Sequence, residues 1–196
     1  MSRNINKKRQ EEILLSLKKC DYLSRSQLQK MHDLKSDRNA QRVLRNMENY
    51  LSSFFDGEKV FYLNKNGREQ VGCSVVRKKT QNVRHFLIRN DYFIHVGCPD
   101  TWKNEIKITH EPSNVTVVCD AVYSKNGRDY LVEIDHLQAM AKNRRKVHKY
   151  RCLFESGAFR RPTHLIWITT TEYRRRLLLD LCHGLNVRVF LDCEIK

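Results

Sequence analysis

The sequence predicts a mixed α and β protein of two domains, an α+β domain at residues 1–75 and an α/β domain at residues 80–196. Three observations support this fold class. Apolar residues recur at helical spacing through the first fifty positions. Asp56-Gly57 and Asn126-Gly127 each separate two β-rich runs, which is a strong hairpin signal. From Trp102 onward strand and helix patterns alternate, as expected for a mixed sheet with helices on its faces.

The bulk composition favours a nucleic-acid partner. The 196 residues carry a net charge of +15, and the excess falls on both predicted domains. We expect no membrane association, because no segment approaches the 18 or so apolar residues of a membrane span and the N-terminus has no apolar signal region. The seven cysteines form no Cys-x-x-Cys pair, which indicates reduced, mostly buried thiols in a cytoplasmic protein.

Three helices are predicted in the first domain. Residues 5–20 carry Ile5 and three further apolar side chains at near-helical spacing. A short second helix would be capped by Ser24 or Ser26, and Ser36 would cap a third helix.

The third helix has one apolar face and one polar face that is rich in amide and guanidinium groups. The apolar positions extend at helical spacing from Ala40 to Leu51. Arg pairs with guanine and Asn or Gln with adenine, and all of them reach phosphates, so a DNA-reading surface is predicted. An ordinary solvated helix face is the alternative. The side chains of the predicted surface are Arg38, Asn39, Gln41, Arg42, Arg45, Asn46 and Asn49.

A β-hairpin over residues 53–63 follows these helices. Three helices and then a hairpin is the order of a winged helix-turn-helix, and residues 62–69 resemble the strand-then-Gly exit of bacterial winged-helix regulators. The resemblance implies that the third helix enters the major groove of duplex DNA. The hairpin tip, with Lys59, would contact the adjacent backbone.

The second domain is predicted to follow the order β-β-β-α-β-α-β from Trp102. A helix at 81–88 and a strand at 92–96 precede it, and residues 102–108 fit either a helix end or a strand. The later elements are a hairpin about Asn126-Gly127, a helix over about 136–156 ended by Gly157, a strand at 164–169, a helix at 171–183 with Gly184 after it, and a strand at 187–191.

Three carboxylates are expected on one face of that hairpin. If Asn126-Gly127 is a two-residue turn, Lys125 pairs with Arg128 and Asp120 lies opposite Glu133. Asp135 then points to the same face. Like charges this close need a cation or a proton. The sequence therefore suggests a divalent-metal site at Asp120, Glu133 and Asp135, against the alternative of ordinary solvated acids.

The helix that follows is strongly basic. Residues 136–162 contain eight Lys or Arg and one acid, which predicts a second phosphate-contacting surface that Arg174–Arg176 extends. A solvated helix with long basic side chains is the alternative. The candidate DNA contacts here are Arg144, Arg145 and Lys149.

The order of these elements, with Asp on the second strand and Glu-x-Asp on the third, resembles the PD-(D/E)xK nuclease fold over residues 80–191. The resemblance implies that Asp120 and Glu133 hold Mg²⁺ and that Glu105 is the upstream acid. Asp135 stands at the position of the family's catalytic Lys. Either the domain has lost its activity, or Lys142 or Lys146 from the next helix supplies the amine. The candidate catalytic set, if the domain is active, is Glu105, Asp120, Glu133, Asp135 and Lys146.

The whole chain resembles the replication-relaxation family. The motifs that carry this resemblance are Trp102-x-x-Glu105, Asp120-Ala-x-Tyr123, the strand ending in Val-Glu-Ile-Asp135, and Lys146-x-x-x-Tyr150. Family members occur on plasmids, phages and conjugative elements. The resemblance implies a DNA-binding role in replication, DNA relaxation or mobile-element control.

We therefore expect a sequence-specific double-stranded DNA-binding protein whose nuclease-like domain is inactive and which needs no cofactor to bind DNA. The first alternative is an active Mg²⁺-dependent endonuclease or nickase. The second is an interaction module that recruits replication or transfer proteins. Homodimerisation stays open, because the sequence shows no heptad seam.

Overall fold

The chain divides into two compact units, residues 1–90 and 91–196. The structure is a computed structural model that describes residues 2–196, with side chains from residue 7 onward, so Ile5 lies outside the described side chains. The expected domain boundary at residues 75–80 lies in the segment between helices α4 and α5. The first part of α5 packs within the first unit.

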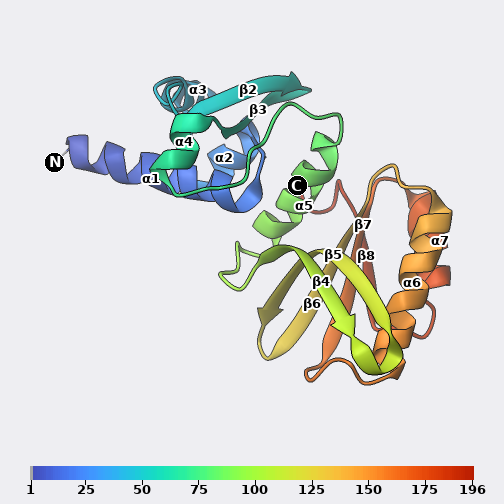
Figure 1. The fold of residues 1–196 in the computed structure, drawn as a ribbon. Helices are drawn as coiled ribbons and strands as arrows, with labels where there is room; N and C mark the ends of the chain where they lie inside the picture. Colours follow the sequence, from blue (N-terminus) through green and yellow to red (C-terminus); the bar gives the residue numbers. More distant parts are fainter. Residues whose placement is uncertain (1) are drawn as a thin grey trace. The chain divides into compact units, whose positions relative to one another are not determined.

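The first unit begins with the three expected helices (Figure 1). They are α1 (Ser2–Cys20), α2 (Arg25–Met31) and α3 (Asp37–Arg45). Ser24 is the cap of α2, where its hydroxyl accepts from the Gln27 N–H and the Gln27 side chain accepts from the Ser24 N–H. Ser36 caps α3.

Helix α3 is shorter than its apolar pattern predicts. It ends at Arg45, and the chain continues through turns into strand β2 at Leu51. Met47 and Leu51 are nevertheless buried, because the Leu51 N–H still donates to the Met47 carbonyl across the turns. Asn46 and Asn49, which have low helix propensity, therefore lie in the turns that follow the helix.

The first unit also contains a three-stranded sheet. Its strands are β1 (Leu23–Ser24), β2 (Leu51–Asp56) and β3 (Glu58–Leu63), in the order β1-β3-β2. The expected hairpin is present, and Gly57 makes its tight turn with a φ of +72°.

Helix α4 (Lys65–Gln70) follows the hairpin, and a long loop leads to α5 (Val83–His95). The prediction of a strand at 92–96 was wrong, because α5 continues to His95. The residues Val83, Leu87, Ile88, Tyr92 and Phe93 are all buried, at positions that are distributed around the helix.

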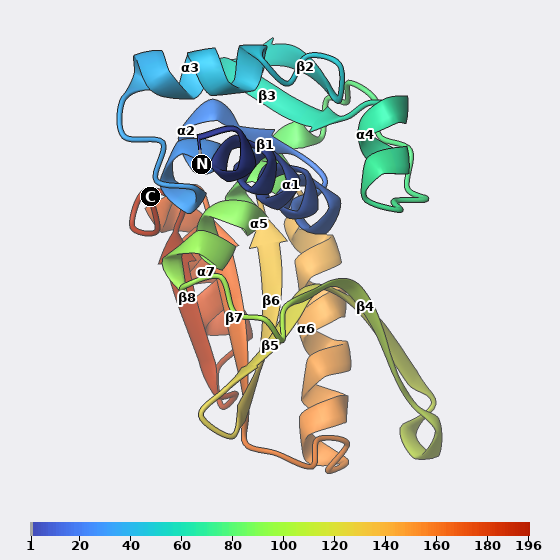
Figure 2. The same cartoon turned by 90° about the vertical axis from the view of Figure 1, so that its left-hand side faces the viewer.

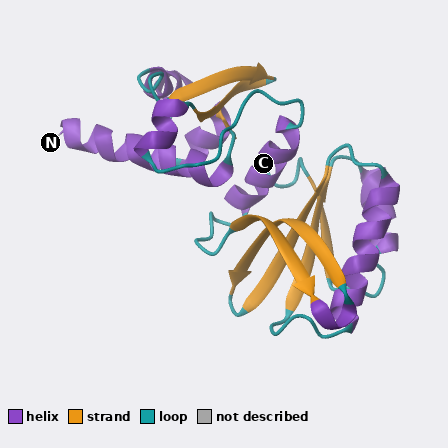
Figure 3. Cartoon of the chain, viewed as in Figure 1, coloured by secondary structure: helices purple, strands orange, loops and turns teal. Residues whose placement is uncertain are grey.

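The second unit is built on a five-stranded mixed sheet in the order β4-β5-β6-β7-β8. Figure 3 draws the strands in orange. The first three strands are antiparallel, and β6, β7 and β8 are parallel. The strands are β4 (Lys103–His110), β5 (Val115–Lys125), β6 (Arg128–Asp135), β7 (Thr163–Thr169) and β8 (Val187–Leu191), with a short 3₁₀ helix, η1 (Glu111–Ser113), between β4 and β5.

Helices α6 (Met140–Glu155) and α7 (Glu172–Leu181) make the crossovers between the parallel strands and lie on the same face of the sheet (Figures 1 and 2). Their buried side chains pack with Leu131, Leu165 and Trp167 of β6 and β7. The predicted order β-β-β-α-β-α-β is confirmed. Of the two alternatives for residues 102–108, the structure has the strand, because β4 begins at Lys103. Cys119 and Cys182 are buried as expected, whereas Cys193 is exposed.

Within the described part of the chain, no helix combines the length and the hydrophobicity that a bilayer crossing requires.

Gly67 in α4 offers a test of the first unit's packing. A Cβ at this position would lie 2.2 Å from the Tyr50 carbonyl oxygen, a backbone atom that also accepts from the Asn64 N–H. We expect Gly67→Ala to lower the unfolding free energy by about 1–3 kcal/mol, as overpacking does, measured by urea denaturation. Gln70→Ala, at an exposed position of the same helix, is the control. Equal stability of the two variants would contradict the close approach.

Candidate functional site

Two acidic side chains are buried at the carboxyl end of β6, the central strand of the second sheet. Glu133 is 1% exposed and Asp135 is fully buried. Burying an ionised carboxylate is costly unless charged and hydrogen-bonding partners surround it. The partners of these two acids therefore determine what the site can do.

Glu133 is held by two residues of α6. The Lys146 ammonium donates to its Oε2 atom, and the Tyr150 hydroxyl donates to its Oε1 atom. Residues four apart in a helix lie on the same face, so the Lys146-x-x-x-Tyr150 motif presents both donors to one carboxylate. The structure thus gives this motif a definite role as the clamp of Glu133.

Asp135 has a different set of partners. Arg174 of α7 donates to both of its oxygens, at 2.7 Å from Nε and 2.5 Å from Nη2. Asn143 of α6 and Thr169 of β7 each donate one further hydrogen bond, at 2.7 and 3.0 Å. These four bonds use the accepting capacity of the carboxylate.

Asp120 lies next to Glu133 but outside the regular ladder. The predicted turn is present, and β5 and β6 pair in the predicted register from Lys125 opposite Arg128 to Ala121 opposite Val132. The pairing ends there, one residue before Asp120. The Asp120 Oδ2 atom instead accepts from the Ile134 N–H at 2.8 Å. On β4, exposed Glu105 falls between the pairs Asn104–Ala121 and Ile106–Cys119, with a φ of +52°.

The three carboxylates proposed as metal ligands therefore do not share one site. Asp120 and Glu133 are close together, whereas Asp135 is engaged by Arg174. Among the described residues, no group of three or more His, Cys, Asp or Glu side chains is arranged to hold a metal ion. These donors do not fit the three-carboxylate Mg²⁺ site that the spacing suggested.

Electrostatics couple the remaining pair to Lys146. Burial raises the pKa of Glu133, and the nearby Asp120 carboxylate raises it further, against the opposing effect of Lys146. Burial lowers the pKa of Lys146, but Glu133 and Asp120 outweigh it, and the pKa is raised overall. Lys146 therefore stays cationic and compensates two acids.

The Trp102-x-x-Glu105 and Asp120-Ala-x-Tyr123 motifs meet on the side of β5 that is opposite to Glu133. The rings of Trp102 and Tyr123 stack at 5.6 Å between centroids, and Tyr123 stacks on Tyr130 at 4.6 Å. The Tyr92 ring of α5 packs against the same group. The Trp-x-x-Glu and Asp-Ala-x-Tyr motifs thus each supply one ring to the core and one acid to the β4–β5 region.

A basic groove lies beside Asp120 and Glu133, which together form the carboxylate cluster. It has a volume of about 350 Å³ and is lined by residues of β5, of α6 and of the loop before α6. Lys146 is 22% exposed and lines this groove while it binds Glu133. The lining residues are Val117, Val118, Gln138, Lys142, Arg145, Lys146 and Lys149. Of the three DNA contacts predicted on α6, Arg145 and Lys149 line the groove and Arg144 does not.

Two of the three arginines at 174–176, Arg174 and Arg175, are engaged by acids within the second unit, whereas Arg176 is exposed. Arg174 binds Asp135, Arg175 pairs with Glu194 and Glu172, and Arg176 lies 3.8 Å from Glu172. The role of Arg174 could not be recognised from the sequence, because Asp135 is 39 positions away and only the return of the chain through β7 brings them together.

The polar surface predicted on α3 is exposed in the first unit. Arg38, Gln41, Arg42 and Arg45 are exposed on the helix, and Asn46 and Asn49 are exposed in the turns after it. Asn39 is partly buried, where its side chain donates to the Leu34 carbonyl and accepts from Arg42.

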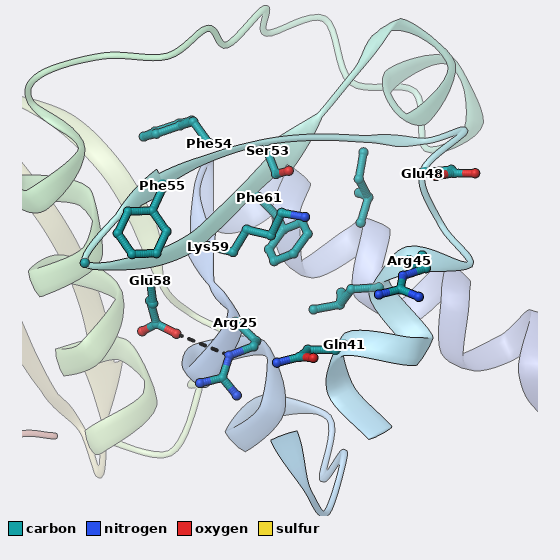
Figure 4. A pocket seen from close by; sticks show the side chains of 13 residues that line it. Arg25, Gln41, Arg45, Glu48, Ser53, Phe54, Phe55, Glu58, Lys59 and Phe61 are labelled. Atoms are coloured by element: carbon teal, nitrogen blue, oxygen red, sulfur yellow. Dashed lines mark ion pairs between the residues drawn. The ribbon is translucent and has the colours of Figure 1, made fainter. Parts of the chain in front are cut away.

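A cleft of about 710 Å³ separates α3 from the β2–β3 hairpin. Gln41 and Arg45 line it from the helix, and Lys59 lines it from the hairpin (Figure 4). Phe55, 75% exposed, lies on the same hairpin. Sequence reasoning missed Arg25, which also lines the cleft and pairs with Asp37 at 2.6 Å and with Glu58 at 3.9 Å.

Removing Lys146 should destabilise the protein in a pH-dependent way. In Lys146→Met, Glu133 stays buried beside Asp120, so its folded-state pKa rises further above the unfolded value of about 4.3. Such a loss is small near pH 4 and grows as pH rises through the raised pKa of Glu133. We expect a loss of about 3 kcal/mol at pH 8, measured by urea denaturation.

Lys142→Met is the matched control, because Lys142 is exposed on the same helix. An equal loss at pH 4 and pH 8 in Lys146→Met would mean that Lys146 contributes packing and not charge compensation.

Comparison with known proteins places the chain in a family. A model of the replication-relaxation family matches residues 14–167, a range that includes α3, the carboxylate cluster and the basic groove. No curated protein and no solved structure matched the chain. Because the matched range covers well over half of its length, the protein belongs to the replication-relaxation family.

Proposed function

We propose that the protein is a sequence-specific duplex DNA-binding protein of a bacterial mobile element, acting in replication, DNA relaxation or transfer, or transcriptional control. The observation that carries this proposal is the exposed Arg and Gln surface of α3 beside the β2–β3 hairpin, where Phe55 and Lys59 near the turn are exposed. Family membership supports the same area of function.

The first unit serves in this proposal as a winged helix-turn-helix. Three helices precede the hairpin, and β1 joins it as a third strand. Helix α3 would read base edges in the major groove, and Lys59 on the hairpin would contact the neighbouring phosphates. Asp37, at the start of α3, is already paired with Arg25, so its charge is compensated within the protein.

The second unit serves as a nuclease-like domain without activity. Asp135 occupies the place of a catalytic amine, and Arg174 engages it fully. The Asp120 carboxylate accepts a hydrogen bond from the Ile134 backbone N–H. The buried acids stabilise the attachment of α6 and α7 to the sheet, which is a structural use of the motif.

The DNA-reading surface can be tested with Arg42→Ala combined with Arg45→Ala. We expect the double variant to lose at least tenfold in affinity for the specific duplex, because each base contact contributes about 1–3 kcal/mol of discrimination. The target is first selected from a random duplex library, and binding is then measured by mobility shift.

Lys8→Ala combined with Lys65→Ala is the control, since both residues are exposed on other helices of the first unit. It removes the same charge and should retain the preference for the selected site. If the Arg42 and Arg45 variant retained that preference as well, another surface would read the DNA.

An active Mg²⁺-dependent endonuclease or nickase is the second candidate function. The observation that favours it is the position of Lys146 beside Glu133 and Asp120. Lys146 of α6 thus brings to these two acids the amine that the nuclease family supplies from the strand, at the position of Asp135.

Incubation with supercoiled plasmid and Mg²⁺ or Mn²⁺ distinguishes the two candidates. We expect no cleavage above background from the purified protein. Nicking that Glu133→Gln abolishes, and that Glu155→Gln on the exposed side of α6 retains, would establish the nuclease.

A further inference from the structure

The basic groove of the second unit combines four cationic side chains with no acidic side chain in its lining. Lys142, Arg145, Lys146 and Lys149 all come from α6, and the opposite wall is formed by Val117 and Val118 of β5. Val118 is 50% exposed. The concentration of positive charge indicates an anionic ligand.

Two of these cations are oriented by the protein itself. Lys149 donates to the Thr116 carbonyl at 2.9 Å, and Lys146 donates to Glu133. An ammonium group has three N–H donors, so each lysine retains donors for a ligand. Lys142 and Arg145 are exposed on the same side of the helix.

The spacing of the cations matches a phosphodiester backbone. Residues 142 to 149 span seven positions of α6, or about 10 Å along the helix axis. One strand of B-DNA advances about 3.4 Å along the duplex axis per phosphate and also winds around that axis. Successive phosphates are therefore farther apart than this rise, and a row of cations about 10 Å long can reach two of them.

The lining also indicates duplex DNA over a free single strand. Proteins that hold single strands stack bases on aromatic side chains. The groove wall that the structure describes contains Val, Gln, Lys and Arg only. Such a surface can bind phosphates but offers no platform for unstacked bases.

We propose that this groove binds the phosphate backbone of one strand of duplex DNA, independently of base sequence. It would thus be a second DNA contact, additional to the base-reading surface of α3. The inference rests on the proposed function in taking DNA as the ligand. It assigns a separate role to the second unit, which strengthens binding to any duplex while α3 selects the site.

The second unit supplies a close comparison for the test. Lys142→Ala with Arg145→Ala removes two exposed groove cations. Arg144→Ala with Arg160→Ala removes the same charge from exposed positions that do not line the groove. Lys142→Gln with Arg145→Gln is a second groove pair that keeps longer side chains.

Fluorescence anisotropy with a duplex lacking the selected site, at 50–200 mM salt, measures the contact. We expect the groove pair to bind about tenfold or more weakly at low salt, and its slope of log affinity against log salt to fall by about 2, or about 0.9 for each lost phosphate contact. The Arg144 and Arg160 pair should keep the wild-type slope. Circular dichroism and thermal melting verify that each variant is folded.

Two results would overturn the inference. One is a slope that falls equally in both pairs, which would mean that only overall charge matters. The other is a loss confined to single-stranded DNA of the same sequence, which would assign the groove to that ligand.

A different measurement, the preference for the selected site, would show that α3 does not read the DNA sequence. The Arg42 and Arg45 variant would then keep its preference for the selected site, whereas the groove variants are judged on the salt slope alone.

Discussion

The second unit depends on the burial of two carboxylates at the end of one central strand. Glu133 and Asp135 lie two residues apart on β6, between an antiparallel and a parallel neighbour. Neither can be left uncompensated, because a buried charge without a partner costs several kcal/mol. Lys146 with Tyr150 compensates the first, and Arg174 with Asn143 and Thr169 compensates the second. The partners of Glu133 attach α6 to the sheet, and those of Asp135 attach α7 through Arg174 and α6 again through Asn143, so both helices are fixed on the same face.

The same arrangement connects the carboxylate cluster with the surface. Lys146 binds a buried acid and also lines the groove where Lys142, Arg145 and Lys149 gather. One helix thus carries a buried side with Tyr150 and Asn143, an intermediate position at Lys146, and an exposed basic side. This division explains why a helix with so many cations is stable, since its apolar and buried polar residues hold it against the sheet.

Several features of the fold could be predicted because they depend on neighbouring residues. The turn at Asn126-Gly127 has a two-residue geometry that few other dipeptides favour, and it set the register of β5 and β6 up to Ala121. Ser24 and Ser36 cap their helices through hydrogen bonds to residues only three positions further along the chain. The prediction of a strand at 92–96 was wrong because contacts with distant residues determine the structure there. Tyr92 and Phe93 have β-forming side chains, but burial against Trp102 and Tyr123 keeps them in α5.

By itself, the sequence determined the order of the strands and helices after Trp102, the two hairpins and the polar surface of α3, since these follow from local periodicity and turn chemistry. It also predicted three acids on one face of β5 and β6, of which the structure brings Asp120 close to Glu133 and gives Asp135 to Arg174. Only the tertiary structure decided their partners. Asp135 and Arg174 are 39 positions apart, and Glu133 meets Lys146 only after α6 folds back across the sheet. Compensation of a buried charge depends on distance in space, which the spacing of residues along the chain does not specify.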